Sequence, residues 1–548
     1  MRDFLRSHGT AGLALIRRAS RDTFSRKREK GAQGRWGRPV IDDSGTPRRR
    51  ERARAPRATQ AATPQLPRLA VPWAPLDVFS ADEVERLLEA TFTVLQEIGL
   101  EIRSPAARAV YARHGALVDD EGIVRLGRDI VAEFCGKAPE RFVLHARNPE
   151  RDLNVGGNVV NFGPVNGAPH IGDSERGRRY GDIEAFRDIL KVTHALGVLH
   201  WQGGVVVEPV DLPVPTRHLD MYHAHITLSD AVWAARGIGG VAARDGIAMS
   251  AIEHGVSLDD LARHPRLMIV TNINSPRRVD EEILDCIMAI AEHGQCVVAT
   301  PFTLMGAMAP VTLPGALVQQ TAEALGVIAL VEMIRPGTPA VIGGFTSNVD
   351  MRTGSPVFGT PEYVHATLGG AQIARRLKIP FRSSAVCASP VVDAQATYET
   401  GFSLWASIMS HSHLINHAAG WLEGGLTASM EKIVVDAEVL RGWAELLKPK
   451  GFSDADIALD AIREVAPGGH FFGSQHTLAR YETAFYRPLL SYSNNFENWR
   501  DSGARTATDR ATDIWKKARE AYVAPPLDAG VTEALQAYVA KRKEELAG

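Results

Sequence analysis

The stretch PFRSSAVCASPVVDAQATYETGFSLWASIMSHSHLINHAAG, residues 380–420, reads as one strand–helix–strand unit. Residues 380–388 and 412–420 are short, mostly small or apolar runs, and residues 393–411 between them are long enough for several helical turns. Strands with few charges along either face are typical of a parallel sheet that is covered on both sides. The unit therefore predicts a parallel sheet whose strands are connected by helices.

The same alternation of short apolar runs and longer amphipathic runs repeats from about residue 150 onward. The eight strand candidates are residues 159–165, 199–209, 230–238, 267–275, 295–302, 340–347, 380–388 and 412–420. Eight alternating units in a segment of this length predict an α/β fold of the (β/α)8 TIM barrel type. The alternative is a doubly wound open sheet. However, GNVVNFGPVNG at residues 157–167 lacks the G-x-G-x-x-G spacing of a dinucleotide-binding turn.

Further regions flank the predicted barrel domain, which we place at residues 151–500. Residues 68–150 predict a helical region, whose longest helix begins after Ser80 with Glu83 three residues later in a capping box. Residues 501–548 predict C-terminal helices.

Residues 1–67 predict a disordered, arginine-rich arm. Residues 1–60 contain 15 Arg and 2 Lys against 6 acidic residues, although the whole chain has a net charge of −2. So few apolar residues cannot offset the entropy lost on folding. Clustered arginines can attract nucleic acid or a membrane surface, but the arm lacks interleaved aromatic residues. We therefore expect no nucleic-acid or membrane partner, and interpret the arm as a solvated tail or an over-extended gene start.

The chain carries only four cysteines, and none of them forms a C-x-x-C pair. This favours reduced, buried thiols and a cytoplasmic location. The usual catalytic motifs are also missing from the sequence, namely H-E-x-x-H, the G-x-x-x-x-G-K-[ST] phosphate loop and G-x-S-x-G at a strand–helix turn. No strand candidate contains a lysine for Schiff-base chemistry. We expect no metal site.

Aromatic and acidic residues gather near the ends of the strand candidates. Phe345 lies at the end of the sixth candidate and Trp421 follows the eighth; Glu208 belongs to the second, and Asp393 and Glu399 follow the seventh. Ring faces and carboxylates are what a quaternary ammonium cation requires, because it cannot donate a conventional hydrogen bond. Two other interpretations stay open: the rings fill the core, and Asp393 only caps a helix.

The chain resembles the trimethylamine methyltransferase family of corrinoid-dependent enzymes. The resemblance rests on stretches between about residues 160 and 480, in order, none of which is specific alone. They are NFGPVNGAPHIGD, TNINSPRRVDEEIL, TPFTLMGAMAPVTLPGAL, AEALGVIALVEMIRPGTPAVIGG, VDMRTGSPVFGTPE, VVDAQATYE and PGGHFFGSQHT.

The resemblance implies a (β/α)8 barrel and methyl transfer from a methylated amine to the Co(I) corrinoid of a separate protein. No cofactor is then bound tightly by this chain. Founding members carry pyrrolysine, whereas every residue here is a standard one, as in the branch that uses glycine betaine. On this basis Asn272 and Gln395 would orient a substrate carboxylate. One or two of the acids would pair with arginines, with candidates Arg236, Arg335, Arg352 and Arg382.

Another class of function fits the same barrel, because a fold does not fix a function. The alternative is a non-catalytic protein that binds or senses quaternary amines. A mouth wide enough for a corrinoid protein would favour the enzyme, and a sealed pocket would favour the sensor. The sequence leaves open whether the chain forms a homo-oligomer.

Overall fold

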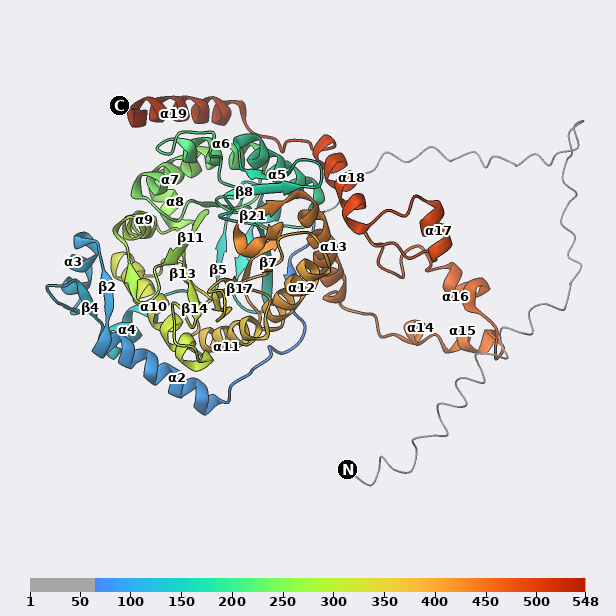
Figure 1. Ribbon diagram of the computed structural model, residues 1–548, viewed down its shortest axis with the longest axis horizontal. Coiled ribbons are helices and arrows are strands. Elements are labelled where there is room, and N and C mark those ends of the chain that lie inside the picture. The colour runs from blue at the N-terminus through green and yellow to red at the C-terminus, as the bar shows by residue number, and fades with distance from the viewer. Residues whose placement is uncertain (1–64, 548) are drawn as a thin grey trace, which may run out of the picture. The chain divides into compact units, whose positions relative to one another are not determined.

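A computed structural model describes residues 65–547, so nearly all of the expected basic arm lies outside the described residues. The described chain is built around a curled eight-stranded sheet with helices along its outer face (Figure 1). The strand order is β1-β7-β19-β18-β15-β13-β11-β10. The strands are β1 (Leu69–Ala70), β7 (Val159–Pro164), β10 (Trp233–Ala235), β11 (Leu267–Ile273), β13 (Cys296–Pro301), β15 (Ala340–Gly343), β18 (Phe381–Ser384) and β19 (Leu414–Ala419).

The sheet is parallel except for the antiparallel pair of β1 with β7. Seven of the eight strand candidates contain one of its parallel strands, which confirms the α/β class and the parallel sheet of the predicted (β/α)8 barrel. The described strands form a curled sheet that corresponds to part of such a barrel. The candidate at residues 199–209 forms only an isolated bridge at Gln202. There the backbone N–H of His200 donates to Phe162 O and that of Gln202 donates to Val232 O, each at 2.9 Å. A short segment thus connects β7 with β10.

Helices follow the strands and cover the outside of the sheet (Figure 1). They are α5 (Ile183–Leu196), α6 (Arg217–Leu228), α7 (Gly240–His254), α8 (Leu258–Arg263), α9 (Glu281–Glu292), α10 (Leu313–Ile334), α11 (Pro361–Leu377), α12 (Ala394–Met409) and α13 (Met430–Leu446). Among the described helices, α10 alone has the length and hydropathy of a membrane span, and 83% of its most apolar window is buried in the protein. It therefore serves as a core helix.

Small accessory sheets extend the loops of the main sheet. The strands are β5 (Phe142–Leu144) with β6 (Leu153–Val155); β8 (His170–Asp173), β9 (Gly177–Tyr180), β20 (Trp421–Leu422) and β21 (Thr427–Ser429); and β14 (Thr303–Met305), β16 (Thr346–Val349) and β17 (Pro356–Val357). The last two sheets follow the carboxyl ends of β7, β13, β15 and β19. They therefore lie at the end of the sheet where parallel α/β folds place their sites.

The region before the sheet is less helical than expected. Helix α2 (Ala81–Thr93) has the predicted capping box: Glu83 N–H donates to Ser80 Oγ at 3.3 Å and Ser80 N–H donates to Glu83 Oε2 at 2.8 Å. The rest of the region holds a π-helical turn (Val94–Ile98), α3 (Pro105–Arg113), α4 (Arg128–Cys135) and the strands β2 (Leu100–Ile102), β3 (Leu117–Val118) and β4 (Ile123–Arg125), which join β12 (Arg278–Val279) in a second sheet. Such short strands carry too little periodicity to be recognised in sequence.

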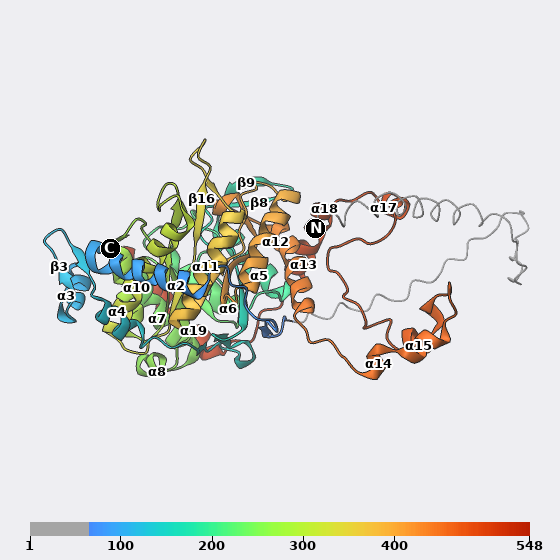
Figure 2. The ribbon, with the colours of Figure 1, turned by 90° about the horizontal axis from the view of Figure 1, so that it is seen from below.

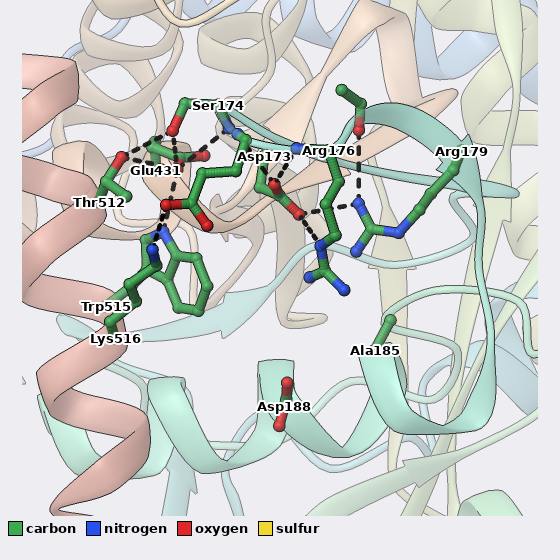
Figure 3. Close-up of polar contacts among 12 residues, drawn as sticks. Asp173, Ser174, Arg176, Arg179, Ala185, Asp188, Glu431, Thr512, Trp515 and Lys516 are labelled. Atoms are coloured by element: carbon green, nitrogen blue, oxygen red, sulfur yellow. Dashed lines mark hydrogen bonds and ion pairs between the residues drawn. The ribbon is translucent and has the colours of Figure 1, made fainter.

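Two helices end the chain, α18 (Ala507–Glu520) and α19 (Ala529–Ala547). Helix α18 is fastened by the buried Glu431, whose Oε1 accepts hydrogen bonds from Ser174 Oγ at 3.0 Å, Thr512 Oγ1 at 2.9 Å and Trp515 Nε1 at 3.0 Å (Figure 3). Beside it, Asp173 Oδ2 accepts from Arg176 and Arg179 (Figure 3). These hydrogen bonds and ion pairs join α18 to α13 and to the β8–β9 turn, which is a structural role.

Between α13 and α18 the chain leaves the main body as a projecting arm, residues 448–505 (Figures 1 and 2). The projecting arm contains short helices, α14 (Asp454–Ile457), α15 (Leu459–Glu464), α16 (Gln475–Leu478) and α17 (Phe496–Asp501). It also exposes large apolar side chains, including Phe452 at 91%, Phe472 at 82% and Phe485 at 83%. The projecting arm thus forms little core of its own.

Candidate active site

The inside of the curled sheet has an apolar layer near the amino ends of the strands. Met268, Val298, Val341 and Leu414, from four different strands, belong to one buried cluster with Trp201. Because side chains alternate along a strand, the residues two positions further on also face the inside. These positions lie nearer the carboxyl ends, where a parallel sheet opens to its loops.

Polar residues occupy this next layer. Val270 of β11 packs against the inner apolar cluster. Asn272 is two positions further along the same strand, so it lies on the same inner face, and it is exposed at the carboxyl end. Parallel pairing aligns Arg382 with Gly343 and Leu414, and Ser384 with Asn416. Paired residues of neighbouring parallel strands share a face, so Arg382, Ser384 and Asn416 also point inward. The sheet therefore encloses a polar layer above an apolar one.

An aromatic cluster lies at the carboxyl ends of β13, β15 and β19. Phe345 is its centre: its ring centroid is 5.3 Å from that of Phe302, 5.7 Å from Phe358, 5.8 Å from His417 and 6.4 Å from Trp421. The two predicted wall residues, Phe345 and Trp421, thus meet edge to face at 78°. The cluster thus places four other rings around Phe345, which is itself buried.

The backbone of β19 places His417 in this cluster. The pairing of β19 with β7 shifts between Ile415 and Ala419, and His417 has a φ of 57°. Such a bulge re-aims a side chain that regular alternation would turn away. The pKa of His417 is held well below 6.5 by burial and by the charge of Arg382. The imidazole is therefore neutral and does not repel a cation.

The turn that follows β19 positions Trp421. Gly420 has a φ of 94°, and a Cβ there would lie 2.8 Å from Ile433 Cγ1, so only glycine fits without strain. Its N–H donates to the buried Asp436 Oδ2 at 2.8 Å. The Trp421 carbonyl accepts from Cys387 Sγ at 3.1 Å, which ties the loop after β18 to this turn.

Glu208 forms an ion pair with two arginines. Its Oε1 accepts from Arg217 Nη1 at 2.7 Å and from Arg236 Nη1 at 3.1 Å. The expected pairing of an acid with Arg236 is thus present in the structure. With two cations to one carboxylate, this group carries a net positive charge and does not by itself attract an ammonium ion.

The acids after β18 are engaged in building their own loop. Asp393 Oδ1 accepts from Ala396 N–H at 2.9 Å, which caps α12, and from Ser389 Oγ at 3.0 Å. Glu399 is buried and accepts from the N–H groups of Ala388 and Ser389, while Gln395 Nε2 donates to it at 2.9 Å. The structure therefore brings these three residues together as a loop support.

Several residues of the site were not singled out in the sequence analysis as ligand contacts. They are Phe302, Phe358, Arg382, Asn416 and His417. Phe302 is the last residue of one strand candidate, and Arg382, Asn416 and His417 lie within two others, so a signal was present in their positions. Of the other candidate arginines, Arg335 bonds backbone carbonyls of Ala262 and Glu292, at the amino ends of the strands.

The described residues contain no group of three or more His, Cys, Asp or Glu side chains that could hold a metal ion. The four cysteines are buried, and burial raises the pKa of Cys387 to about 11 and that of Cys286 to about 12. Thiols in such surroundings are poor nucleophiles. The candidate site therefore consists of aromatic rings and of cationic or neutral polar groups.

These features define an α/β protein with an aromatic cluster and an inner polar layer at the carboxyl ends of a parallel sheet. The chain belongs to the trimethylamine methyltransferase family, whose sequence profile matches residues 46–547. It is thus a methyltransferase.

Named relatives match over most of their length. The chain is 34% identical over 471 residues to the glycine betaine methyltransferase of Desulfitobacterium hafniense strain Y51, covering 86% of this chain and 98% of the relative. It is 25% identical to the L-carnitine:corrinoid methyltransferase of Eubacterium limosum, covering 82% and 94%. The crystal structure of the Methanosarcina barkeri monomethylamine methyltransferase superposes with a TM-score of 0.47 at 11% identity, covering 84% and 89%.

Proposed function

We propose that this protein transfers a methyl group from a quaternary amine of the glycine betaine kind to the Co(I) corrinoid of a separate partner protein. The observation that carries the proposal is the aromatic cluster around Phe345, which lies where a (β/α)8 barrel has its active site. Rings are the groups that hold a permanently methylated cation. The names of the relatives, a glycine betaine and an L-carnitine:corrinoid methyltransferase, support the same class of donor and acceptor.

The proposed reaction requires little acid–base catalysis by this chain. When the N–CH3 bond breaks, its electron pair stays on nitrogen, so the product is a neutral tertiary amine that needs no proton. Co(I), when the partner brings it, supplies the electron pair for the new bond to the methyl carbon. The residues here bind the donor, point a methyl group toward the mouth and exclude water. Phe345, Trp421 and the neutral His417 are the ring walls.

The charge balance of the site fits this reaction. A substrate that loses its positive charge in the transition state is held back by anions that stabilise only the ground state. Glu208 is offset by Arg217 and Arg236, and the Glu399 carboxylate is taken up by backbone N–H groups. We therefore assign Asp393, Gln395 and Glu399 to the support of the loop after β18, and Asn272 to the polar inner face.

A docking surface for the corrinoid protein is supported by the rim of the sheet. Loops that follow successive strands expose apolar side chains, which are Val210, Val214, Ile238, Val311, Met351, Val391 and Leu426. Apolar side chains at the same end of a parallel sheet suit a protein partner better than they suit solvent. The corrinoid would enter with that partner, so we propose no cofactor bound tightly by this chain.

We further propose a place in cytoplasmic one-carbon metabolism, without nucleic-acid or membrane partners. We also propose a homo-oligomer. The projecting arm supports it, because Phe452, Phe472 and Phe485 are almost fully exposed and a second copy would bury them.

The test is anaerobic incubation of the protein with Co(I) cobalamin and a panel of betaines, with trimethylamine for comparison. Appearance of the methylcobalamin absorbance with one or more betaines is the expected result. Tight binding of a betaine without any methyl transfer, also with corrinoid proteins as acceptors, would instead favour the alternative, a non-catalytic binding or sensing protein.

A further inference from the structure

Arg382 is a buried cation for which the described residues, 65–547, supply no carboxylate. It is 2% exposed, and its Nε and Nη1 atoms have no hydrogen-bond partner within that part of the chain. Burial lowers its pKa to about 10, which still leaves the guanidinium charged at neutral pH. Buried charges are almost always paired or bound to a ligand, because an unpaired buried charge is strongly destabilising.

The position of Arg382 puts this charge inside the sheet. Its register partners are Gly343 on one side and Leu414 on the other, and Leu414 belongs to the inner apolar cluster. Its guanidinium carbon lies 5.3 Å from the centre of the Phe345 ring. The unpaired cation and the centre of the aromatic cluster are thus within reach of one small molecule.

Other unused polar atoms share this inner face. Both side-chain amide atoms of Asn416 and the hydroxyl of Ser384 are buried without a hydrogen-bond partner among the described residues. Ser384 and Asn416 are register partners on adjacent strands, two positions after Arg382 and Leu414. Together with Nε and Nη1 of Arg382 they offer donors that match the acceptor sites of one carboxylate. Buried polar groups rarely stay unsatisfied, so this set indicates an absent anionic ligand.

We propose that Arg382, with Asn416, binds the carboxylate of a zwitterionic quaternary amine, whose trimethylammonium end then lies against Phe345 and Trp421. This inference rests on the proposed function and makes it narrower. The carboxylate neutralises a guanidinium that would otherwise repel the ammonium group from the same rings. A methylated amine without a carboxylate leaves the cation unpaired, which penalises trimethylamine and choline as substrates.

The first arm of the test uses the wild-type protein and needs no corrinoid. Calorimetry compares glycine betaine and L-carnitine with betaine amide, in which a neutral carboxamide replaces the carboxylate, and with tetramethylammonium. We expect glycine betaine or L-carnitine to bind at least ~100-fold more tightly than betaine amide and tetramethylammonium, neither of which has a carboxylate. Equal affinities, or no binding by any of the four at millimolar concentration, overturn the proposal.

The second arm compares variants in both binding and methyl transfer. Arg382→Met is expected to weaken binding of the carboxylated ligand by ~100-fold or more while tetramethylammonium binds no worse, and Arg382→Lys should recover part of the loss. Arg335→Met is the matched control, since Arg335 bonds backbone carbonyls at the opposite end of the sheet. Unchanged betaine affinity in Arg382→Met overturns the carboxylate assignment. Lack of methyl transfer by a wild-type protein that passes the binding test overturns the proposed function instead.

Discussion

The ring centres of His417 and Trp421 lie 3.8 Å apart, the closest approach within the aromatic cluster. The two residues are four positions apart in the chain, and the bulge in β19 brings their rings together with an angle of 38° between the ring planes. Because the Nδ1 atom of His417 is buried without a partner in the described chain, nothing there stabilises a protonated ring. The imidazole therefore acts as a third neutral ring beside Phe345 and Trp421.

The first prediction concerns the pH dependence of ligand binding. A protonated His417 would repel an ammonium ion, but burial and the nearby Arg382 charge keep its pKa well below 6.5. We expect the dissociation constant of glycine betaine to change less than about twofold between pH 6 and pH 8. Titration calorimetry at several pH values measures this. A tenfold weakening at pH 6 that follows one ionisation would show that the imidazole takes up a proton in the site.

The second prediction concerns the ring walls. Phe345→Ala and Trp421→Ala should each weaken binding of a quaternary amine by about 2–30-fold, because each ring contributes roughly 0.5–2 kcal/mol to a bound cation. Phe402→Ala is the control, since that ring is exposed on α12 and stacks only on Trp405. Unchanged affinity in both wall variants would mean that the cluster serves only as packing.

These residues show which parts of the candidate site can be predicted from the sequence. The strand candidate at residues 340–347 placed Phe345 at a strand end, and Trp421 directly follows another candidate, so both could be predicted. His417 could not, because its orientation depends on a bulge that alternation does not reveal. Arg382 lies in a predicted strand, but which face it occupies follows only from the register with Gly343 and Leu414.

The strand candidate at residues 199–209 shows a different limit. It is apolar and contains two adjacent glycines, Gly203 and Gly204, yet it pairs only near Gln202. A Cβ on Gly204 would lie 3.0 Å from the carbonyl oxygen of Ala235, so the backbone passes too close to the end of β10 for side chains to continue a strand. Apolar composition predicts burial, but close backbone approach is a tertiary property.

The third prediction separates the two roles considered for Asp393. Its Oδ1 accepts the Ala396 N–H and thereby caps α12. Asp393→Ala should therefore lower the free energy of unfolding by about 1 kcal/mol, while Asp393→Ser keeps a capping oxygen and most of that stability. Betaine affinity should stay the same in both variants. Denaturant unfolding and calorimetry check the two readouts, and a large loss of affinity in Asp393→Ser would instead favour contact with the substrate.

The fourth prediction concerns Glu253, a buried acid on α7. Burial raises the pKa of Glu253 to about 7. The hydrogen bond from Trp233 Nε1 at 2.8 Å and the charge of Arg147 lower the pKa but do not offset burial. A carboxyl with a raised folded-state pKa holds its proton longer in the folded protein than in the unfolded chain. Its contribution to stability is therefore full below about pH 4.5 and falls as the pH rises toward about 7.

Glu253→Gln keeps an acceptor for Trp233 and removes the ionisation. We expect the variant to gain stability relative to the wild type, on the order of 2 kcal/mol, between pH 4.5 and pH 8. Chemical unfolding of both proteins across this pH range gives the difference in their free energies of unfolding. Histidines titrate in both proteins, so their contributions cancel in this difference. A difference that does not change with pH would mean that Glu253 has the same pKa in both states.

The fifth prediction concerns the projecting arm. The side chains of Phe452, Phe472 and Phe485 are exposed. Exposure of apolar surface to water is unfavourable by about 25 cal/mol for each Å². A second copy of the chain can bury these side chains. The triple variant Phe452→Ser, Phe472→Ser and Phe485→Ser should run as a monomer in light scattering, whereas the wild type should not. Val210→Ser and Val214→Ser, on the rim after residue 209, form the matched control, because they remove exposed apolar side chains outside the projecting arm and should leave the oligomer intact. A monomeric wild type would contradict the proposed homo-oligomer and would mean that the exposed phenylalanines of the projecting arm contact a different partner.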